Sequence, residues 1–178
     1  MSWKGTVYRF ASVEYSSKDD LITGMGAKTH AGRWNPKGSF PTVYTSLTPE
    51  TALAESRAHF DYYQVDFADA TPIVLTSIHV SLSCILDLTV GPIRTKLRVS
   101  LKRMRDENWR KLNQRGKTSL TQTLGQSLHG TGFEAILVPS FAMPGFRNLV
   151  IFPENLRKDS VLTITNESKL PLNREGTQ

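Results

Sequence analysis

The sequence has few of the features that mark secreted, membrane-spanning or metal-binding proteins. Among its 178 residues there is a single cysteine, Cys84, so an intrachain disulfide is excluded and a reducing compartment is favoured. Cys84 itself is expected in a buried strand. No apolar run approaches the roughly 18 residues of a membrane-spanning helix, and the N-terminus has no apolar signal segment. No second His or Cys stands at metal-ligand spacing from His79, so no metal site is expected.

The chain also lacks internal repeats, an evident linker and a Gly-rich phosphate-binding loop. We therefore predict one soluble, cytoplasmic domain over residues 1–165, followed by a loose polar tail over 166–178. A domain of this size buries about 70% of the surface that its unfolded chain exposes, so it needs no disulfides to fold.

Negative charge is scarce in one segment. Between Arg94 and Lys117 there are ten basic and two acidic residues, so this segment carries +8 and the rest of the chain −2, for a total of +6. Such a basic block attracts nucleic acid, a polyphosphate ligand or an acidic protein, although a solvated helix face is the commoner explanation.

The densest group of unusual residues is the stretch 31–40. Arg33 and Trp34 stand side by side, and Gly32, Pro36 and Gly38 favour turns around them. An Arg binds phosphate or carboxylate through paired hydrogen bonds, and a Trp offers an apolar wall for a flat ring. The stretch therefore suits an anionic ligand that carries a base, or else Trp34 fills the core beneath a turn with Arg33 at the surface.

Short strands mixed with helices, without regular alternation, predict an α+β domain. One helical turn begins near Asp19 within an otherwise polar loop, 16–28. Helices are predicted at 49–62, 100–112 and 119–129, and strands at 6–11, 43–46, 72–80, 84–88, 133–138, 148–153 and 161–164.

The predicted helix 49–62 has the clearest start, since Thr48 offers an N-cap and Pro49 suits the first helical position. Its periodicity places Leu53 and Phe60 on the apparent core side and leaves Glu55 off it. By periodicity alone Glu55 faces either water, the usual place for a helical Glu, or a cleft.

Six short motifs occur in one order along the chain, and together they resemble the RES domain family. The motifs are Tyr8-Arg9-Phe10, Gly32-Arg33-Trp34-Asn35-Pro36, Val43-Tyr44-Thr45-Ser46, Ala52-Leu53-Ala54-Glu55, Val138-Pro139-Ser140 and Asn148-Leu149-Val150. The resemblance implies an ADP-ribosyltransferase-like fold, a mixed sheet core with flanking helices. It also implies a toxin of a bacterial toxin–antitoxin pair that consumes NAD.

The implied reaction cleaves the nicotinamide N-glycosidic bond of NAD, and phosphate or water accepts the ADP-ribosyl group. NAD is then a substrate, and no cofactor is implied. Two alternatives stay open: an ADP-ribosyltransferase that modifies a protein, and a non-catalytic nucleic-acid-binding module built on 94–117.

By motif position, the resemblance makes Arg33, Glu55 and Ser140 the Arg, Glu and Ser of the family name, with Arg9 and Tyr44 as further pocket residues. Arg9 and Arg33 would bind the pyrophosphate, and Tyr44 would stack on nicotinamide. Glu55 would stabilise an oxocarbenium-like ribose. Ser140 would hydrogen-bond the carboxamide or ribose; a nucleophilic role is less favoured because no His or acid lies near it in sequence.

The resemblance also implies partners. It predicts an antitoxin with a helix-turn-helix domain and a homodimeric core, with no membrane contact and with nucleic acid bound only through the antitoxin.

Overall fold

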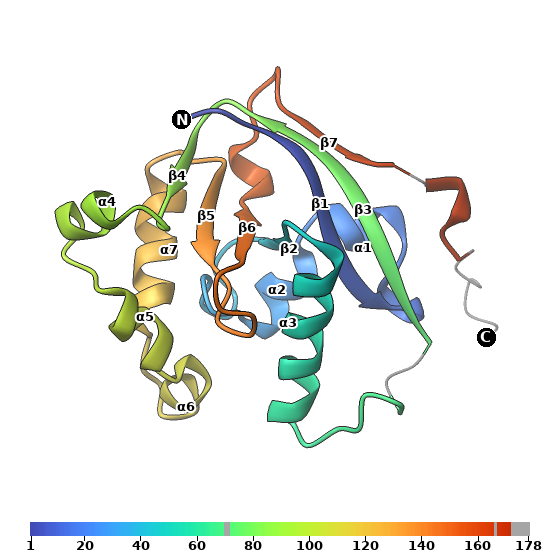
Figure 1. The fold of residues 1–178 in the computed structure, drawn as a ribbon, viewed down its shortest axis with the longest axis horizontal. Coiled ribbons are helices and arrows are strands. Elements are labelled where there is room, and N and C mark those ends of the chain that lie inside the picture. The colour runs from blue at the N-terminus through green and yellow to red at the C-terminus, as the bar shows by residue number, and fades with distance from the viewer. Residues whose placement is uncertain (70–71, 166, 172–178) are drawn as a thin grey trace.

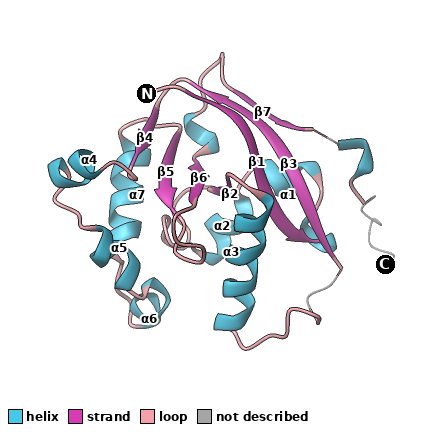
Figure 2. Cartoon of the chain, in the orientation of Figure 1, coloured by secondary structure: helices cyan, strands magenta, loops and turns pink. Residues whose placement is uncertain are grey.

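The computed structural model describes residues 1–69, 72–165 and 167–171 (Figure 1). Within these residues seven strands form one mixed sheet with helices around it, which confirms the predicted α+β class (Figure 2). The strands are β1 (Trp3–Ser12), β2 (Val43–Ser46), β3 (Ile73–Leu82), β4 (Ile85–Asp87), β5 (Ala135–Pro139), β6 (Arg147–Ile151) and β7 (Val161–Ile164). The α-helices are α1 (Lys18–Ile22), α2 (Met25–His30), α3 (Pro49–Tyr62), α4 (Gly91–Lys96), α5 (Leu101–Asp106), α6 (Trp109–Gln114) and α7 (Leu120–Gly130).

The sheet has the order β4-β5-β6-β2-β1-β3-β7 and consists of two parts, β4-β5-β6-β2 and β1-β3-β7. β1 pairs with β3 along ten residues, whereas its register with β2 is a single pair, Tyr8 opposite Ser46. Only β4 and β5 pair in parallel; the other pairs between described strands are antiparallel. The two parts therefore separate beyond Tyr8 and Ser46, and the site described below lies near this junction.

Both faces of the central strands are buried, because alternate residues enter different clusters. In β5 and β6, Leu137 and Leu149 pack into one cluster with Leu21 of α1. Ile136 and Val150 pack into the other with Trp34 and helix α7. This two-sided burial explains the nearly continuous apolar runs of these strands.

Helix α3 begins and ends where the sequence predicts. The Thr48 side chain accepts a hydrogen bond from Thr51 N at 3.2 Å, and Pro49 occupies the first turn. The predicted core side is wrong, however, because the buried residues of α3 are Thr51 and Ala52 rather than Leu53 or Phe60. Ala52 precedes Glu55 by three residues, so Glu55 lies toward the sheet and not on the solvent side.

Three local predictions differ from the structure. The expected loop 16–28 contains a second helix, α2, which starts after Gly24 adopts the left-handed conformation at φ 72°. The expected helix 100–112 is divided into α5 and α6 because Asn108 caps a new helix, accepting from Lys111 N at 3.0 Å. Cys84 is half-buried and lies just before β4 rather than within a strand.

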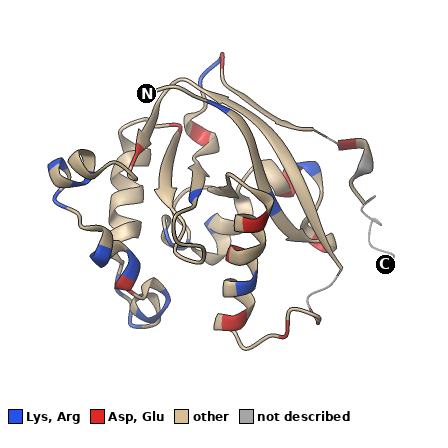
Figure 3. Cartoon of the chain, in the orientation of Figure 1, with Lys and Arg blue, Asp and Glu red and all other residues tan. Residues whose placement is uncertain are grey.

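Positive charge gathers on α4 to α6, which carry most of the basic block (Figure 3). No helix in the described ranges is long and apolar enough to cross a membrane. Of the expected tail, residues 166 and 172–178 lie outside the described residues. Within 167–171 a short 3₁₀ turn spans Glu167–Lys169, and Glu167 forms an ion pair with Lys18 at 3.1 Å.

Candidate active site

The Glu55 carboxylate is held by two donors from distant parts of the chain. Ser140 Oγ donates to Glu55 Oε1 at 2.7 Å, and Asn148 Nδ2 donates to the same oxygen at 2.6 Å. Asn148 is itself oriented by Ser46, whose hydroxyl donates to Asn148 Oδ1 at 2.8 Å. Glu55 Oε2 accepts no hydrogen bond from the described residues, so one oxygen is fixed and the other is left for a ligand.

Adjacent strand ends bring these donors together. Ser46 ends β2, Asn148 lies opposite it on β6, and Ser140 follows the last residue of β5. Ser140 is buried, and its hydroxyl also accepts from Met143 N at 3.0 Å. The hydroxyl thus donates to a carboxylate and accepts from a backbone N–H, which places it to hold Glu55. Glu55 is the acidic partner that Ser140 lacks among its sequence neighbours, and a contact of Ser140 with the carboxamide or ribose stays a prediction.

Arg33 shares the electrostatic environment of Glu55. Its Nη1 donates to Met104 O at 2.9 Å, and its guanidinium lies 4.9 Å from the centre of the Phe141 ring. Burial lowers the pKa of Arg33, the Glu55 carboxylate raises it, and the nearby Arg110 cation lowers it. No other hydrogen bond from this side chain joins it to the described residues, so donors remain for an anionic ligand.

Tyr44 supports the loop that carries Arg33. Its hydroxyl accepts from Trp34 N at 2.8 Å and donates to Asn35 Oδ1 at 2.8 Å. Burial raises the pKa of Tyr44, so the hydroxyl remains a donor. A Cβ at Gly32 would lie 2.3 Å from this hydroxyl, which explains the glycine. Stacking of Tyr44 on nicotinamide stays a prediction, whereas its contact with the loop is a second role that the sequence did not indicate.

For Trp34 the structure agrees with the second of the two roles that the sequence left open, whereas ligand binding by Arg33 stays a prediction. Trp34 is 2% exposed and fills the core. Helix α7 holds the same loop, since Gln122 Nε2 donates to Gly32 O at 2.9 Å. Gln122 is fully buried, and its sequence context gave no sign of this role.

Arg9 lies apart from this group. Its Nη1 donates to Leu21 O of α1 at 2.7 Å, and burial lowers its pKa to about 10 although Asp20 raises it. Alternation along β1 places Arg9 on the face opposite Tyr8, and Tyr8 is the residue paired with Ser46. The structure thus brings Arg33, Tyr44, Glu55 and Ser140 together but not Arg9, and a pyrophosphate clamp made by both arginines lacks support in this geometry.

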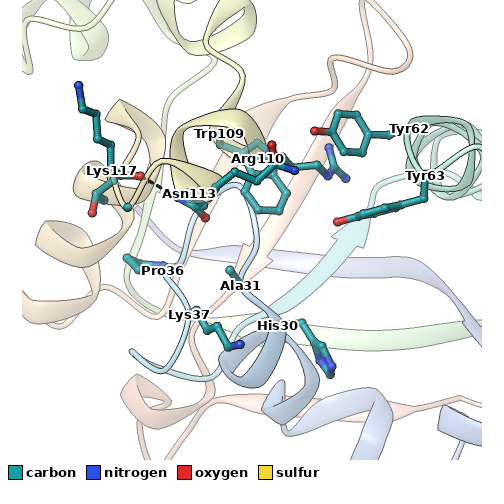
Figure 4. Close-up of a pocket in the computed structure, with 13 residues that line it drawn as sticks. His30, Ala31, Pro36, Lys37, Tyr62, Tyr63, Trp109, Arg110, Asn113 and Lys117 are labelled. Carbon is teal, nitrogen blue, oxygen red and sulfur yellow. Dashed lines mark hydrogen bonds between the residues drawn. The ribbon is translucent and has the colours of Figure 1, made fainter.

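A cleft of about 360 Å³ opens beyond Arg33, between α3, α6 and the loop after α2 (Figure 4). Its walls combine aromatic rings with cations, and the lining residues used below are His30, Lys37, Tyr62, Tyr63, Trp109 and Arg110. No group of three or more His, Cys, Asp or Glu residues that could hold a metal occurs within the described part of the chain.

The model of the RES domain matches residues 6–173 of this sequence. The chain belongs to the RES domain family. In this RES domain the three residues that the sequence motifs assign to the family name, Arg33, Glu55 and Ser140, lie in one site although 107 positions separate the first from the last.

Curated relatives match a shorter segment. The NAD(+) phosphorylase MbcT of Mycobacterium bovis and that of Mycobacterium tuberculosis are each 31% identical over 55 residues, which is 31% of this RES domain chain and 27% of the relative. The match thus spans about a quarter of those proteins. In the solved M. tuberculosis MbcT–MbcA toxin–antitoxin complex, a chain aligns with 92% of this one at a TM-score of 0.71 and 20% identity, over 82% of its own length. The two chains share a fold.

Proposed function

We propose that this RES domain is a NAD-consuming enzyme that transfers the ADP-ribosyl group of NAD to phosphate and releases nicotinamide. The observation that carries the proposal is the Glu55 carboxylate, fixed through one oxygen by Ser140 and Asn148, with no hydrogen bond from the described residues to the other oxygen and with the charge of Arg33 near enough to interact with it. Phosphate is chosen over water because the curated relatives are named NAD(+) phosphorylases.

In the proposed reaction the bond between ribose C1″ and the pyridinium nitrogen breaks, and its electron pair goes to nicotinamide. An oxygen of phosphate forms the new bond to C1″, and the phosphate proton is released to solvent. Positive charge develops on the ribose as the bond breaks, so the fixed carboxylate of Glu55 stabilises the transition state more than the ground state.

Arg33 supplies the complementary charge for the pyrophosphate. Its guanidinium is held at Met104 O and Phe141, which leaves its other N–H groups to bind phosphate oxygens without a reorganisation cost. Ser140 keeps Glu55 in place and does not itself react.

We also propose that the protein acts in the cytoplasm as the toxin of a pair, with an antitoxin that carries a helix-turn-helix domain and with a homodimeric core. Support comes from the family and from the toxin–antitoxin complex that shares the fold. Contact with nucleic acid is assigned to the antitoxin. The basic block supports this division, because Arg110 of the block lines the cleft of the enzyme.

The test mixes purified protein with NAD, with and without phosphate, and follows nicotinamide and the ADP-ribosyl product by mass spectrometry. ADP-ribose 1″-phosphate that forms only with phosphate supports the proposal, and Glu55→Gln serves as the inactive control. Plain ADP-ribose in both samples would instead identify a glycohydrolase. Absence of nicotinamide release from folded protein freed of its partner would overturn NAD cleavage, and a protein acceptor would then be sought.

A further inference from the structure

The cleft beyond Arg33 has the composition of a site for a flat ring that carries several phosphates. Tyr62, Tyr63 and Trp109 supply aromatic surface, and Lys37 and Arg110 supply positive charge. Figure 4 shows Tyr63 and Arg110 on one side of the cleft and Lys37 with His30 on the other, whereas the Lys117 side chain extends away from it. Its volume of about 360 Å³ falls within the roughly 300–1,000 Å³ of small-molecule sites.

Arg110 is arranged as part of a binding wall. Its guanidinium lies 4.4 Å from the centre of the Tyr62 ring and 4.5 Å from that of Trp109, so the cation is stacked between rings. Its Nη2 lies 3.3 Å from His59 Nδ1, but its Nε is buried and has no hydrogen-bond partner among the described residues. A buried donor without a partner costs free energy in the unliganded protein, which a ligand with acceptor oxygens would recover.

Two arginines near each other also favour an anion. The two guanidiniums repel each other, and for this reason the charge of Arg110 lowers the pKa of Arg33. None of the described residues that line the cleft is acidic. An anionic ligand that spans both cations would remove this repulsion.

The cleft is in line with the reaction centre. Tyr62 follows Glu55 by seven residues on α3, which places it on the same side of the helix about 10 Å farther along. A dinucleotide with its nicotinamide ribose at Glu55 and its pyrophosphate at Arg33 extends over such a distance to its adenosine end.

We propose that this cleft binds the adenosine end of the dinucleotide and that its positive charge makes NADP a substrate at least as good as NAD. The proposal rests on the proposed function for the identity of the ligand. Dinucleotide sites that select NAD place an acidic residue against the ribose 2′-hydroxyl, and those that accept NADP place a cation against the 2′-phosphate. This cleft has cations and no acid among its described lining residues.

The first experiment compares kcat/KM for NADP and for NAD in the wild type, in Lys37→Gln and in Lys158→Gln. Lys158 is an exposed lysine on another part of the molecule, so its variant makes the same charge change outside the cleft. We expect the NADP to NAD ratio to be one or higher in the wild type, to fall about tenfold in Lys37→Gln and to stay at the wild-type value in Lys158→Gln. Rejection of NADP by the wild type, or an unchanged ratio in Lys37→Gln, overturns the proposal.

A binding experiment separates this proposal from the proposed function. Calorimetry on Glu55→Gln is expected to show 2′,5′-ADP binding about tenfold more tightly than 5′-AMP. If NAD is cleaved but the two ligands bind equally, the cleft proposal fails and the enzyme assignment stands. If NAD is not cleaved and 2′,5′-ADP still binds more tightly, the enzyme assignment fails and the cleft remains a site for adenosine phosphates.

Discussion

Ser140 donates a hydrogen bond to Glu55 across 85 positions of sequence, at 2.7 Å from Oγ to Oε1. The bond links the turn after β5 to helix α3, and it fixes the carboxylate proposed to stabilise the ribose cation. Because the Ser140 hydroxyl also accepts from Met143 N, the same side chain connects the turn to the site.

Removal of the Ser140 hydroxyl is expected to reduce turnover without abolishing it. In Ser140→Ala, Glu55 keeps its bond from Asn148 but loses one of the two donors to Oε1. We expect kcat for NAD cleavage to fall about tenfold to a hundredfold with a smaller change in KM, because the loss affects the transition state. The control is Ser127→Ala, which removes a hydroxyl on the exposed side of α7. Ser160→Ala would not serve, because the Ser160 hydroxyl donates to the buried Glu134. Activity equal to that of the wild type would show that Ser140 does not position Glu55.

Asn148→Asp is expected to reduce turnover more than Ser140→Ala does. The substitution keeps the shape of the side chain but replaces a donor with an acceptor and places a second carboxylate against Glu55, where Asn148 Nδ2 now donates at 2.6 Å. Because like charges repel, Glu55 loses its position as well as a hydrogen bond, and we expect kcat for NAD cleavage to fall about a hundredfold or more. Steady-state kinetics measure this, and turnover equal to that of the wild type would contradict the proposed contact.

Arg33→Lys is expected to impair binding of the pyrophosphate although charge is conserved. A lysine cannot donate to Met104 O and lie over the Phe141 ring while offering a planar pair of donors to phosphate. We expect ADP-ribose to bind about tenfold to a hundredfold more weakly by calorimetry. Arg157→Lys, in a turn remote from Glu55, is the matched control. Unchanged affinity of Arg33→Lys would remove Arg33 from the pyrophosphate site.

The elements that follow local rules could be predicted from the sequence, and the contacts between them could not. Helix α3 has Thr48 and Pro49 at adjacent positions, so its start is a local matter. The partners of Glu55 depend on which strands lie side by side, and no short pattern contains that information. Family resemblance named Ser140 but gave no role to Asn148, and an Asn in an apolar strand gives no sign of its contact.

The burial of α3 illustrates the same limit. Periodicity favoured Leu53 and Phe60 because they are large and apolar, but small residues let a helix approach the sheet closely. Thr51 and Ala52 are buried in their place. The periodicity argument considers only how hydrophobic each residue is and not how closely a helix can approach the sheet. It therefore placed Glu55 off the core side.

Glu134 is expected to make stability depend on pH. This fully buried carboxylate accepts bonds from Cys84 N at 2.6 Å, Ser83 N at 2.8 Å and Arg157 N at 3.1 Å, and from the Ser160 hydroxyl. Burial raises its pKa, but these hydrogen bonds outweigh burial and lower it. Its contribution to stability is therefore complete above the unfolded value of about 4.3 and is lost as the pH falls through the lower folded value.

Urea unfolding between pH 7 and pH 3 measures this dependence. We expect the free energy of unfolding of Glu134→Gln to be about 3 kcal/mol lower at pH 7, because its amide N–H₂ would face backbone N–H donors. The stability of this variant should also vary less with pH. The exposed Glu154, whose carboxylate lies 4.0 Å from Lys28 Nζ and 3.3 Å from His129 Nε2, provides Glu154→Gln as the control with a small effect.

Gly125→Ala is expected to disturb the Arg33 loop, because Gly125 lies on the side of α7 that packs against this loop. A Cβ at Gly125 would lie 1.9 Å from Trp34 O, a backbone atom of the loop that carries Arg33, so the helix and the loop must separate. We expect a loss of about 3 kcal/mol in urea unfolding together with a higher KM for NAD. In Gly130→Ala, at the end of the same helix, the new Cβ meets no atom within 4 Å. That variant should match or slightly exceed the wild-type stability, since alanine restricts the unfolded chain. Equal stability of the two variants would show that close packing of α7 on the loop does not hold Arg33 in place.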